Sequence, residues 1–159
     1  MASKFPFDLK YHHVGIFVSN MEASAKWYKE MLGYEFMYKN VFPLPGQGDI
    51  PMGWLKHNNH YIELYEYACS PITKEPLKPF DMKDYLGTLG TKHLCLYVED
   101  GQLVPLTKYL EDKGVKFMVK DHTWPKELTE KPDGCRVIYI YDPDGILIEI
   151  QETFKPGEY

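Results

Sequence analysis

The chain has 159 residues, is 44% hydrophobic and carries a formal net charge of −5, with acidic and basic residues interspersed. This composition supplies enough apolar side chains for one domain or two small fused modules. It lacks the continuous basic surface with which a protein binds nucleic acid or an anionic membrane. The three cysteines form no CxxC pair, and residues 1–10 contain no apolar segment of the kind found in secretion signals. We therefore expect a cytoplasmic protein.

The first half of the chain predicts one helix and four strands. The elements expected in chain order are a strand at 13–18, a helix at about 22–32, and strands at 34–38, 52–55 and 61–67. The helical periodicity places Ala25, Tyr28, Met31 and Leu32 on the buried side, and Gly33 is a suitable residue to end the helix. A turn at 57–59 separates the last two strands.

The second half repeats this pattern. The segment HLCLYVED at 93–100 aligns with HVGIFVSN at 13–20, so that a histidine opens a strand in each half. The elements expected after it are a helix at about 101–113 and strands at 115–119, 137–141 and 146–151. Leu106, Tyr109 and Leu110 are expected to face inward from this helix, and the DPDG turn at 142–145 connects the last two strands as a hairpin.

The predicted fold class is α+β, built from two βαβββ modules. The first module is expected at residues 1–67 and the second at 92–159, joined by a proline-containing linker at 68–91. Such a linker is long for a loop within one compact domain. Its length would allow the modules of one chain, or modules exchanged between two chains, to build a functional site together.

One histidine and one glutamate of each half are expected on the sheet face opposite the core. Because side chains alternate along a strand, the even-numbered residues of 13–18 would pack on the helix, and His13 would point the other way. The same alternation applies to Glu63, His93 and Glu149. Taken singly, such a histidine is usually structural and such a glutamate is usually an edge-strand charge. No Lys or Arg stands in register with either glutamate, so the four together predict one divalent cation, with Zn²⁺, Ni²⁺, Co²⁺, Mn²⁺ and Fe²⁺ all left open.

The face that carries these four residues is rich in aromatic side chains. The residues predicted to contact a substrate are Phe17, Tyr65, Tyr67, Cys95, Tyr97 and Gln151. They favour a small, largely uncharged or aromatic oxygenated compound, although the rings could instead only pack around the metal. Cys95 has no evident base, so we do not expect it to be a nucleophile. His12 is expected on the opposite face, either as a structural residue or as a residue that supports a metal ligand without binding the metal. His57, His60 and His122 are expected in exposed loops.

These motifs resemble those of the vicinal oxygen chelate superfamily, which includes glyoxalase I, methylmalonyl-CoA epimerase, extradiol dioxygenases and fosfomycin- and bleomycin-resistance proteins. The segments that carry the resemblance are 12–18, 24–33, 62–64, 92–100 and 142–150. It implies that the paired modules form a cupped mixed sheet around a metal site, with His13, Glu63, His93 and Glu149 at the ligand positions. It also implies a homodimer.

The resemblance implies isomerase, epimerase or lyase chemistry of the glyoxalase I type. Dioxygenases of the superfamily typically lack a ligand at the position of Glu63. A substrate with two adjacent oxygens would chelate the metal as an enediolate or enolate, with Glu149 as the base and Glu63 returning the proton. Phe17 and Tyr67 replace residues that hold glutathione in glyoxalase I. The alternatives are an Fe²⁺-dependent ring-cleaving dioxygenase and a non-catalytic protein that binds a drug or metabolite.

Overall fold

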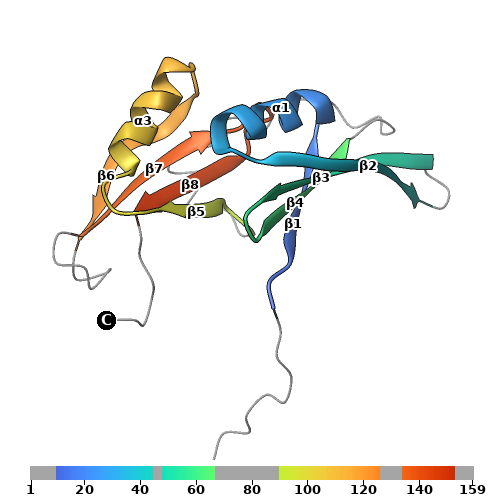
Figure 1. The fold of residues 1–159 in the computed structure, drawn as a ribbon, viewed down its shortest axis with the longest axis horizontal. Helices are drawn as coiled ribbons and strands as arrows, with labels where there is room; N and C mark the ends of the chain where they lie inside the picture. Colours follow the sequence, from blue (N-terminus) through green and yellow to red (C-terminus); the bar gives the residue numbers. More distant parts are fainter. Residues whose placement is uncertain (1–9, 45–47, 67–89, 126–133, 153–159) are drawn as a thin grey trace, which may run out of the picture. The chain divides into compact units, whose positions relative to one another are not determined.

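The computed structural model describes residues 10–44, 48–66, 90–125 and 134–152. The chain divides into two compact units, Met1–Pro71 and Ile72–Tyr159. The elements are β1 (His13–Val18), α1 (Met21–Leu32), β2 (Glu35–Leu44), β3 (Gly48–His57), β4 (His60–Glu66), β5 (Leu94–Val98), α3 (Leu103–Asp112), β6 (Phe117–Trp124), β7 (Cys135–Tyr141) and β8 (Leu147–Glu152) (Figure 1). None of the described helices has the length and apolar character that a bilayer span requires.

The two units have the same sheet topology. The strand order is β1-β4-β3-β2 in the first unit and β5-β8-β7-β6 in the second. The first strand of each unit pairs in parallel with the last one, and the other neighbours are antiparallel. A parallel pair needs a long crossover, and the helix lies within that connection. The predicted α+β fold with two βαβββ modules is therefore confirmed.

Helix α1 follows the sequence prediction closely. The Asn20 side chain caps its first turn by accepting a hydrogen bond of 2.9 Å from the amide of Ala23. Gly33 ends the helix with a φ of 72°, a left-handed conformation that glycine adopts without a steric cost. The buried side of the helix carries Met21, Ser24, Ala25, Tyr28 and Met31. These side chains form the core of the first unit together with buried residues of β3 and β4, such as Leu55 and Leu64.

Helix α3 differs from the prediction in its start and in its buried side. It begins at Leu103, and its buried residues are Leu103 and Leu110. The predicted inward position of Tyr109 is wrong, because this side chain is exposed. The apolar stripe runs from Leu103 through the half-buried Leu106 to Leu110, and Tyr109 lies beside that stripe. The Lys113 ammonium lies 5.6 Å from the centre of its ring.

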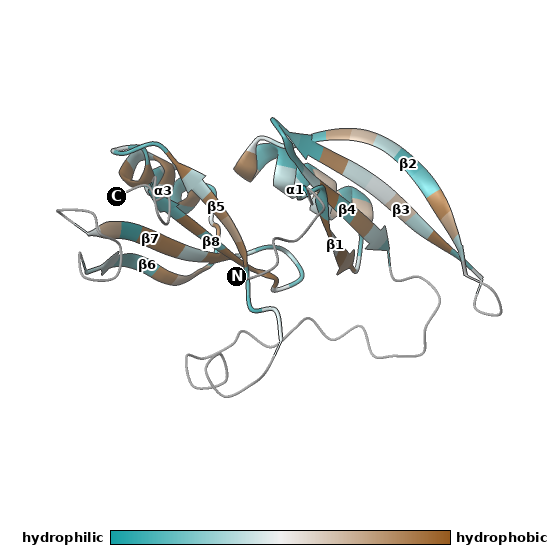
Figure 2. Ribbon diagram, turned by 90° about the horizontal axis from the view of Figure 1, so that it is seen from below, coloured by the Kyte–Doolittle hydropathy of each residue, from teal (hydrophilic) through white to brown (hydrophobic). Residues whose placement is uncertain are grey.

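Strands β2 and β3 are each ten residues long, which is longer than the sequence predicts. Pro43 and Pro51 favour a loop. Pro43 is tolerated because β2 is an edge strand, in which half of the amides need no partner. Pro51 lies in the part of β3 that pairs with β2 alone, since the pairing of β3 with β4 covers only Met52–His57. Hydrophilic and hydrophobic residues are mixed along β2, which hides its strand period (Figure 2). His57, His60 and His122 are exposed as predicted but belong to strands rather than loops.

Gly134 provides a test of the β6–β7 connection. Its φ is 75°, and a Cβ at this position would lie 2.3 Å from the carbonyl oxygen of Trp124. Any alanine at a positive φ loses free energy of unfolding through backbone strain. We expect Gly134→Ala to lose about 1–3 kcal/mol more than that, because the carbonyl oxygen it would meet belongs to the backbone and cannot rotate away. Gly101→Ala is the control, since Gly101 has a φ of 80° but no atom within 4 Å of the added Cβ. It should cost about 1–2 kcal/mol. Urea unfolding measures both, and equal losses would contradict the clash.

Candidate metal and catalytic site

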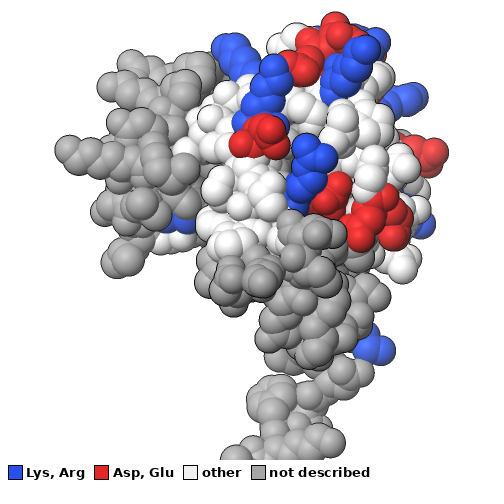
Figure 3. Space-filling model, turned by 90° about the vertical axis from the view of Figure 1, so that its left-hand side faces the viewer, with Lys and Arg blue, Asp and Glu red and all other residues white. Residues whose placement is uncertain are grey.

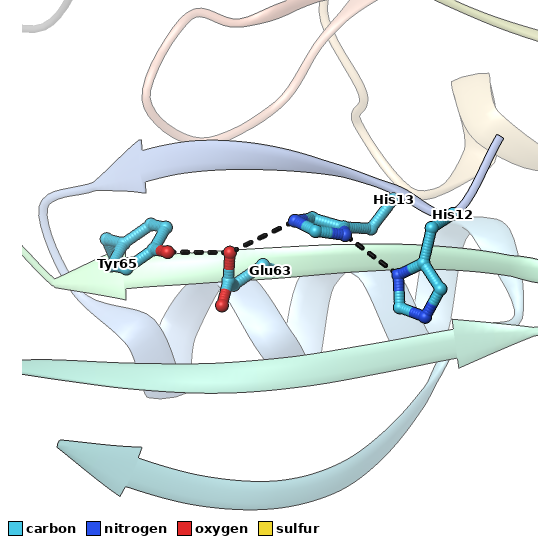
Figure 4. A network of polar contacts seen from close by, with 4 residues as sticks. All are labelled: His12, His13, Glu63 and Tyr65. Carbon is cyan, nitrogen blue, oxygen red and sulfur yellow. Dashed lines mark hydrogen bonds and ion pairs between the residues drawn. The ribbon is translucent and has the colours of Figure 1, made fainter. Parts of the chain in front are cut away.

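In the first unit, neighbouring strands bring His13 and Glu63 together. His13 opens β1, and the strand partner of Glu63 on β1 is Gly15, two residues further along. Both side chains therefore lie on one sheet face, and His13 Nε2 is 3.3 Å from Glu63 Oε2 (Figure 4). Glu63 is only 7% exposed. Gly15 leaves room beside this carboxylate, since a Cβ there would approach it to 3.8 Å.

Two further side chains complete a polar network around this pair. The Tyr65 hydroxyl donates a hydrogen bond of 2.6 Å to Glu63 Oε2, and His12 Nδ1 lies 2.8 Å from His13 Nδ1 (Figure 4). Burial, with the hydrogen bond to Glu63 and the charge of that carboxylate, raises the pKa of Tyr65 to about 12. The phenol therefore keeps its proton at neutral pH and acts as the donor.

His12 lies on the same side as His13. Its ring stacks on Tyr61 with centroids 5.5 Å apart, and Tyr61 is the strand partner of His13. The predicted position of His12 on the opposite face is therefore wrong. His12 precedes β1, so the alternation of a strand does not apply to it. Metal-binding histidines usually hold a partner on their second nitrogen, and His12 Nδ1 lies at that nitrogen of His13, so a supporting role of His12 for a metal ligand stays a prediction.

Besides Tyr61, the described part of this face carries the aromatic residues Trp54, Tyr38 and Phe42, which were not predicted. Trp54 packs against His13 with ring centroids 4.9 Å apart, and Tyr38 stacks on Trp54 at 6.4 Å. Phe42 meets the ring of Tyr65 edge-on at 6.2 Å. Counting back along the hairpin from its turn, where His57 pairs with His60, puts Trp54 opposite Glu63. That signal was present in the sequence, but the turn was predicted at 57–59, one residue longer than the actual turn at 58–59, which shifts the pairing by one position.

The second unit repeats the pairing of histidine with glutamate. His93 immediately precedes β5, and its Nε2 lies 2.8 Å from Glu149 Oε2 on β8. Glu149 is 7% exposed, as is Glu63. Strand pairing matches Cys95 with Glu149 and Tyr97 with Gln151. The ring of Tyr139, the other strand partner of Glu149, lies 5.9 Å from that of His93.

The same strand registers compare the two units position by position. Cys95 takes the place of Gly15, Tyr97 takes the place of Phe17, and Gln151 takes the place of Tyr65. Phe17 and Tyr97 are more than half exposed, at 55% and 56%. Tyr67, which is also among the predicted substrate contacts, lies outside the described residues.

The environment of Cys95 opposes a nucleophilic role. Desolvation, and then the negative charge of Glu149, raises the pKa of the Cys95 thiol from 9.0 to about 12. At neutral pH the group is therefore a thiol, and the thiolate is the reactive form. The side chain nevertheless has an exposed surface, so alkylating reagents can reach it.

We expect Cys95 to react slowly with iodoacetamide at pH 8 in the metal-free protein. A rise in pKa from 9.0 to about 12 reduces the thiolate population about a thousandfold. The greater nucleophilicity of a more basic thiolate restores about 20-fold, which leaves a reaction on the order of 50-fold slower than that of an ordinary thiol. Mass spectrometry of the Cys95 peptide, compared with urea-unfolded protein, measures the ratio. Equal rates would contradict the pKa.

The donor set of each half suits a divalent cation. Within the described part of the chain, the ion pairs of the buried Glu63 and Glu149 are each to a histidine rather than to Lys or Arg. A divalent cation bound to both groups would balance the charge of the buried carboxylate. Each unit supplies two donors. Among residues 10–44, 48–66, 90–125 and 134–152, no three His, Cys, Asp or Glu side chains are grouped closely enough to hold a metal ion.

A cavity of about 560 Å³ in the second unit is separate from these residues. It lies between α3 and strands β6 and β7, and Ile138 belongs to its wall. Ile138 precedes Tyr139, the strand partner of Glu149, so the cavity is on the helix side of the sheet. An ion pair between Lys120 and Glu111 lies along its wall. Basic and acidic side chains are likewise interspersed on the face shown in Figure 3.

Comparison with known proteins decides the family. The family model of the glyoxalase/bleomycin resistance protein/dioxygenase superfamily matches residues 10–150. The chain belongs to this superfamily. The resemblance to vicinal oxygen chelate proteins, predicted from the sequence motifs, is thus confirmed.

Two proteins with similar sequences, one of them uncharacterized and the other an enzyme, match most of this chain. The uncharacterized protein YqjT of Bacillus subtilis (strain 168) is 24% identical over 143 residues, which covers 87% of this chain and 95% of that protein. The mitochondrial methylmalonyl-CoA epimerase of Homo sapiens is 25% identical over 145 residues, which covers 89% of this chain and 73% of that enzyme.

Solved structures of superfamily members share the fold. A glyoxalase family protein from Enterococcus faecalis matches with a TM-score of 0.62 and 23% identity, covering 90% of this chain and 97% of that one. The fosfomycin resistance protein FosX from Listeria monocytogenes, in complex with Mn(II) and sulfate, matches with a TM-score of 0.60 and 13% identity, covering 92% and 94%.

Proposed function

We propose that this superfamily member is a divalent-metal-dependent isomerase or epimerase that moves a proton on a carbon next to a carbonyl group. The observation that carries the proposal is the repeated pair of a histidine and a buried glutamate, at matching positions of two modules with the same topology. An isolated pair of this kind is common in proteins. Its repetition supports a role for all four residues at one centre.

In this proposal His13, Glu63, His93 and Glu149 hold one cation between them. The proposal applies whether the modules of one chain, or of two chains in a homodimer, supply the four donors. The manganese-bound structure of FosX supports a divalent metal. When bound, such an ion supplies a Lewis acid that makes a proton next to a carbonyl easier to remove.

The two glutamates would divide the proton transfer between them. Glu149 takes the proton from one side of the substrate carbon, and Glu63 returns it from the other side, which is the arrangement that an epimerase or 1,2-isomerase needs. Both carboxylates are 7% exposed, so little water competes for the proton. The histidine beside each carboxylate lies 3.3 Å or 2.8 Å away, so the two side chains of each module can bind the same cation.

The surrounding side chains favour a small substrate with two adjacent oxygens and an apolar or aromatic group. Phe17 and Tyr97 present exposed rings at matching positions, and Trp54 and Tyr38 extend the aromatic surface of the first module. Phe17 also occupies the position where glyoxalase I carries an arginine for glutathione. The substrate therefore differs from a glutathione adduct. The relationship to methylmalonyl-CoA epimerase supports proton transfer next to a carbonyl.

Proton NMR in D₂O tests this function. The protein is loaded with Mn²⁺, Co²⁺, Ni²⁺ or Zn²⁺, freed of excess metal, and incubated with a panel of α-hydroxyketones and dicarbonyl compounds, and the substrate is separated before the spectrum is recorded. We expect solvent deuterium to enter the carbon next to the carbonyl, and the exchange to stop when a chelator removes the metal. Oxygen uptake with a catechol would instead indicate a dioxygenase. Tight binding without exchange would indicate a binding protein.

A further inference from the structure

The hydrogen bond between Tyr65 and Glu63 is not used by the proton transfer described above. At 2.6 Å between oxygens it is a short bond to a charged acceptor. It reaches Glu63 Oε2, the same oxygen that faces His13 Nε2 at 3.3 Å (Figure 4). The two contacts converge on one carboxylate oxygen from opposite directions, so the position of that oxygen is defined by both.

The ring of Tyr65 is itself held in place. Phe17 stacks on it with centroids 5.2 Å apart and planes 24° from parallel, and Phe42 meets its edge at 6.2 Å. Aromatic pairs of this geometry contribute about 0.5–1.5 kcal/mol each beyond the area that they bury. Because the ring is fixed from two sides, the hydroxyl can fix the carboxylate in turn.

A flexible ligand gains from such an anchor. A glutamate side chain has three rotatable bonds, and fixing them when a metal binds costs conformational entropy. A hydrogen bond that already holds the side chain before the metal binds reduces this cost. Residues that orient metal ligands in this way typically change metal affinity 10- to 100-fold when they are removed. The second module has Gln151 at the matching position, so the two halves of the proposed site are not chemically equivalent.

We propose that Tyr65 is a positioning residue, which holds Glu63 in its metal-binding orientation through the hydroxyl and makes the half-site of the first module the preformed one. Tyr65 acts through Glu63 rather than on the metal or the substrate. The inference rests on the proposed function in one respect, namely that Glu63 is a metal ligand.

Tyr65→Phe tests this inference because it keeps the ring and its two aromatic neighbours and removes only the hydroxyl. We expect the full chain carrying this change to bind Mn²⁺ 10- to 100-fold more weakly in isothermal titration calorimetry. We also expect an altered Co²⁺ absorption spectrum, which reports the ligand geometry and which a change in packing alone would not affect. Tyr61→Phe is the matched control. It makes the same chemical change on the same strand and face, where Tyr61 stacks on His12, and it should leave the Mn²⁺ affinity within about twofold.

A double-variant cycle shows whether Tyr65 acts through Glu63. In a Glu63→Gln background, Tyr65→Phe should cause no further loss of Mn²⁺ affinity, because the carboxylate that it holds is gone. Additive losses, or an unchanged affinity in Tyr65→Phe alone, would overturn the inference and leave the proposed function standing. If Glu63→Gln and His93→Ala also bind Mn²⁺ as the parent protein does, the proposed metal site itself is wrong. Thermal unfolding of each metal-free variant, followed by circular dichroism, establishes that the fold is retained.

Discussion

Glu149→Gln is expected to slow the exchange of substrate protons with solvent by about 10²–10⁴-fold, the usual contribution of a general base. Glutamine has the size of glutamate and retains an oxygen that can face His93, which lies 2.8 Å from the carboxylate. The loss would therefore come from the missing base and from a weaker metal ligand. Deuterium incorporation, measured by NMR at saturating metal, gives the ratio of rates.

Glu152→Gln is a matched control for this prediction. Glu152 lies on the same strand and is also 7% exposed, but its carboxylate accepts a hydrogen bond of 3.3 Å from the amide of Gly101. We expect the exchange rate of this variant to stay within about twofold of the parent rate, because the residue lies away from the proposed site. An exchange rate that survives in Glu149→Gln, or falls equally in both variants, would remove Glu149 from the role of base.

His93→Ala is expected to lower the affinity for Mn²⁺ by more than about 100-fold. This loss exceeds the usual effect of removing a residue that only orients a metal ligand. The change deletes one of the four proposed donors. It also leaves the buried Glu149 without its histidine partner, which should reduce the free energy of unfolding by about 1–3 kcal/mol in the metal-free protein. Calorimetric titration with Mn²⁺ measures the affinity, and urea unfolding measures the stability.

His122→Ala is the control for metal binding within the same module. His122 is exposed on β6, where its ring meets Trp124 edge-on with centroids 4.8 Å apart. This variant should bind Mn²⁺ as the parent protein does. If His93→Ala keeps the parent affinity, His93 is not a ligand. If both variants lose the same affinity, the metal is binding to surface histidines.

Local sequence patterns predicted the repeated architecture because each element obeys a short period. The alternation of β1, the inward face and glycine end of α1, and the DPDG turn all depend on residues within a few positions of one another. In the turn, for example, Asp142 accepts hydrogen bonds from the amides of Asp144 and Ile146, at 2.9 Å and 2.8 Å. The long hairpin of β2 and β3 was predicted incompletely, because pairing with a neighbouring strand outweighed the local preference of its prolines.

The sequence alone determined that one histidine and one glutamate of each module share a sheet face, since a strand period of two places them there whatever surrounds them. Only the tertiary structure decided which atoms meet. The hydrogen bond from Tyr65 to Glu63, the ring of Trp54 against His13 and the contact of His12 with His13 depend on strand register and side-chain rotamers. Those features are set by packing between segments distant in the chain, and a local period carries no information about them.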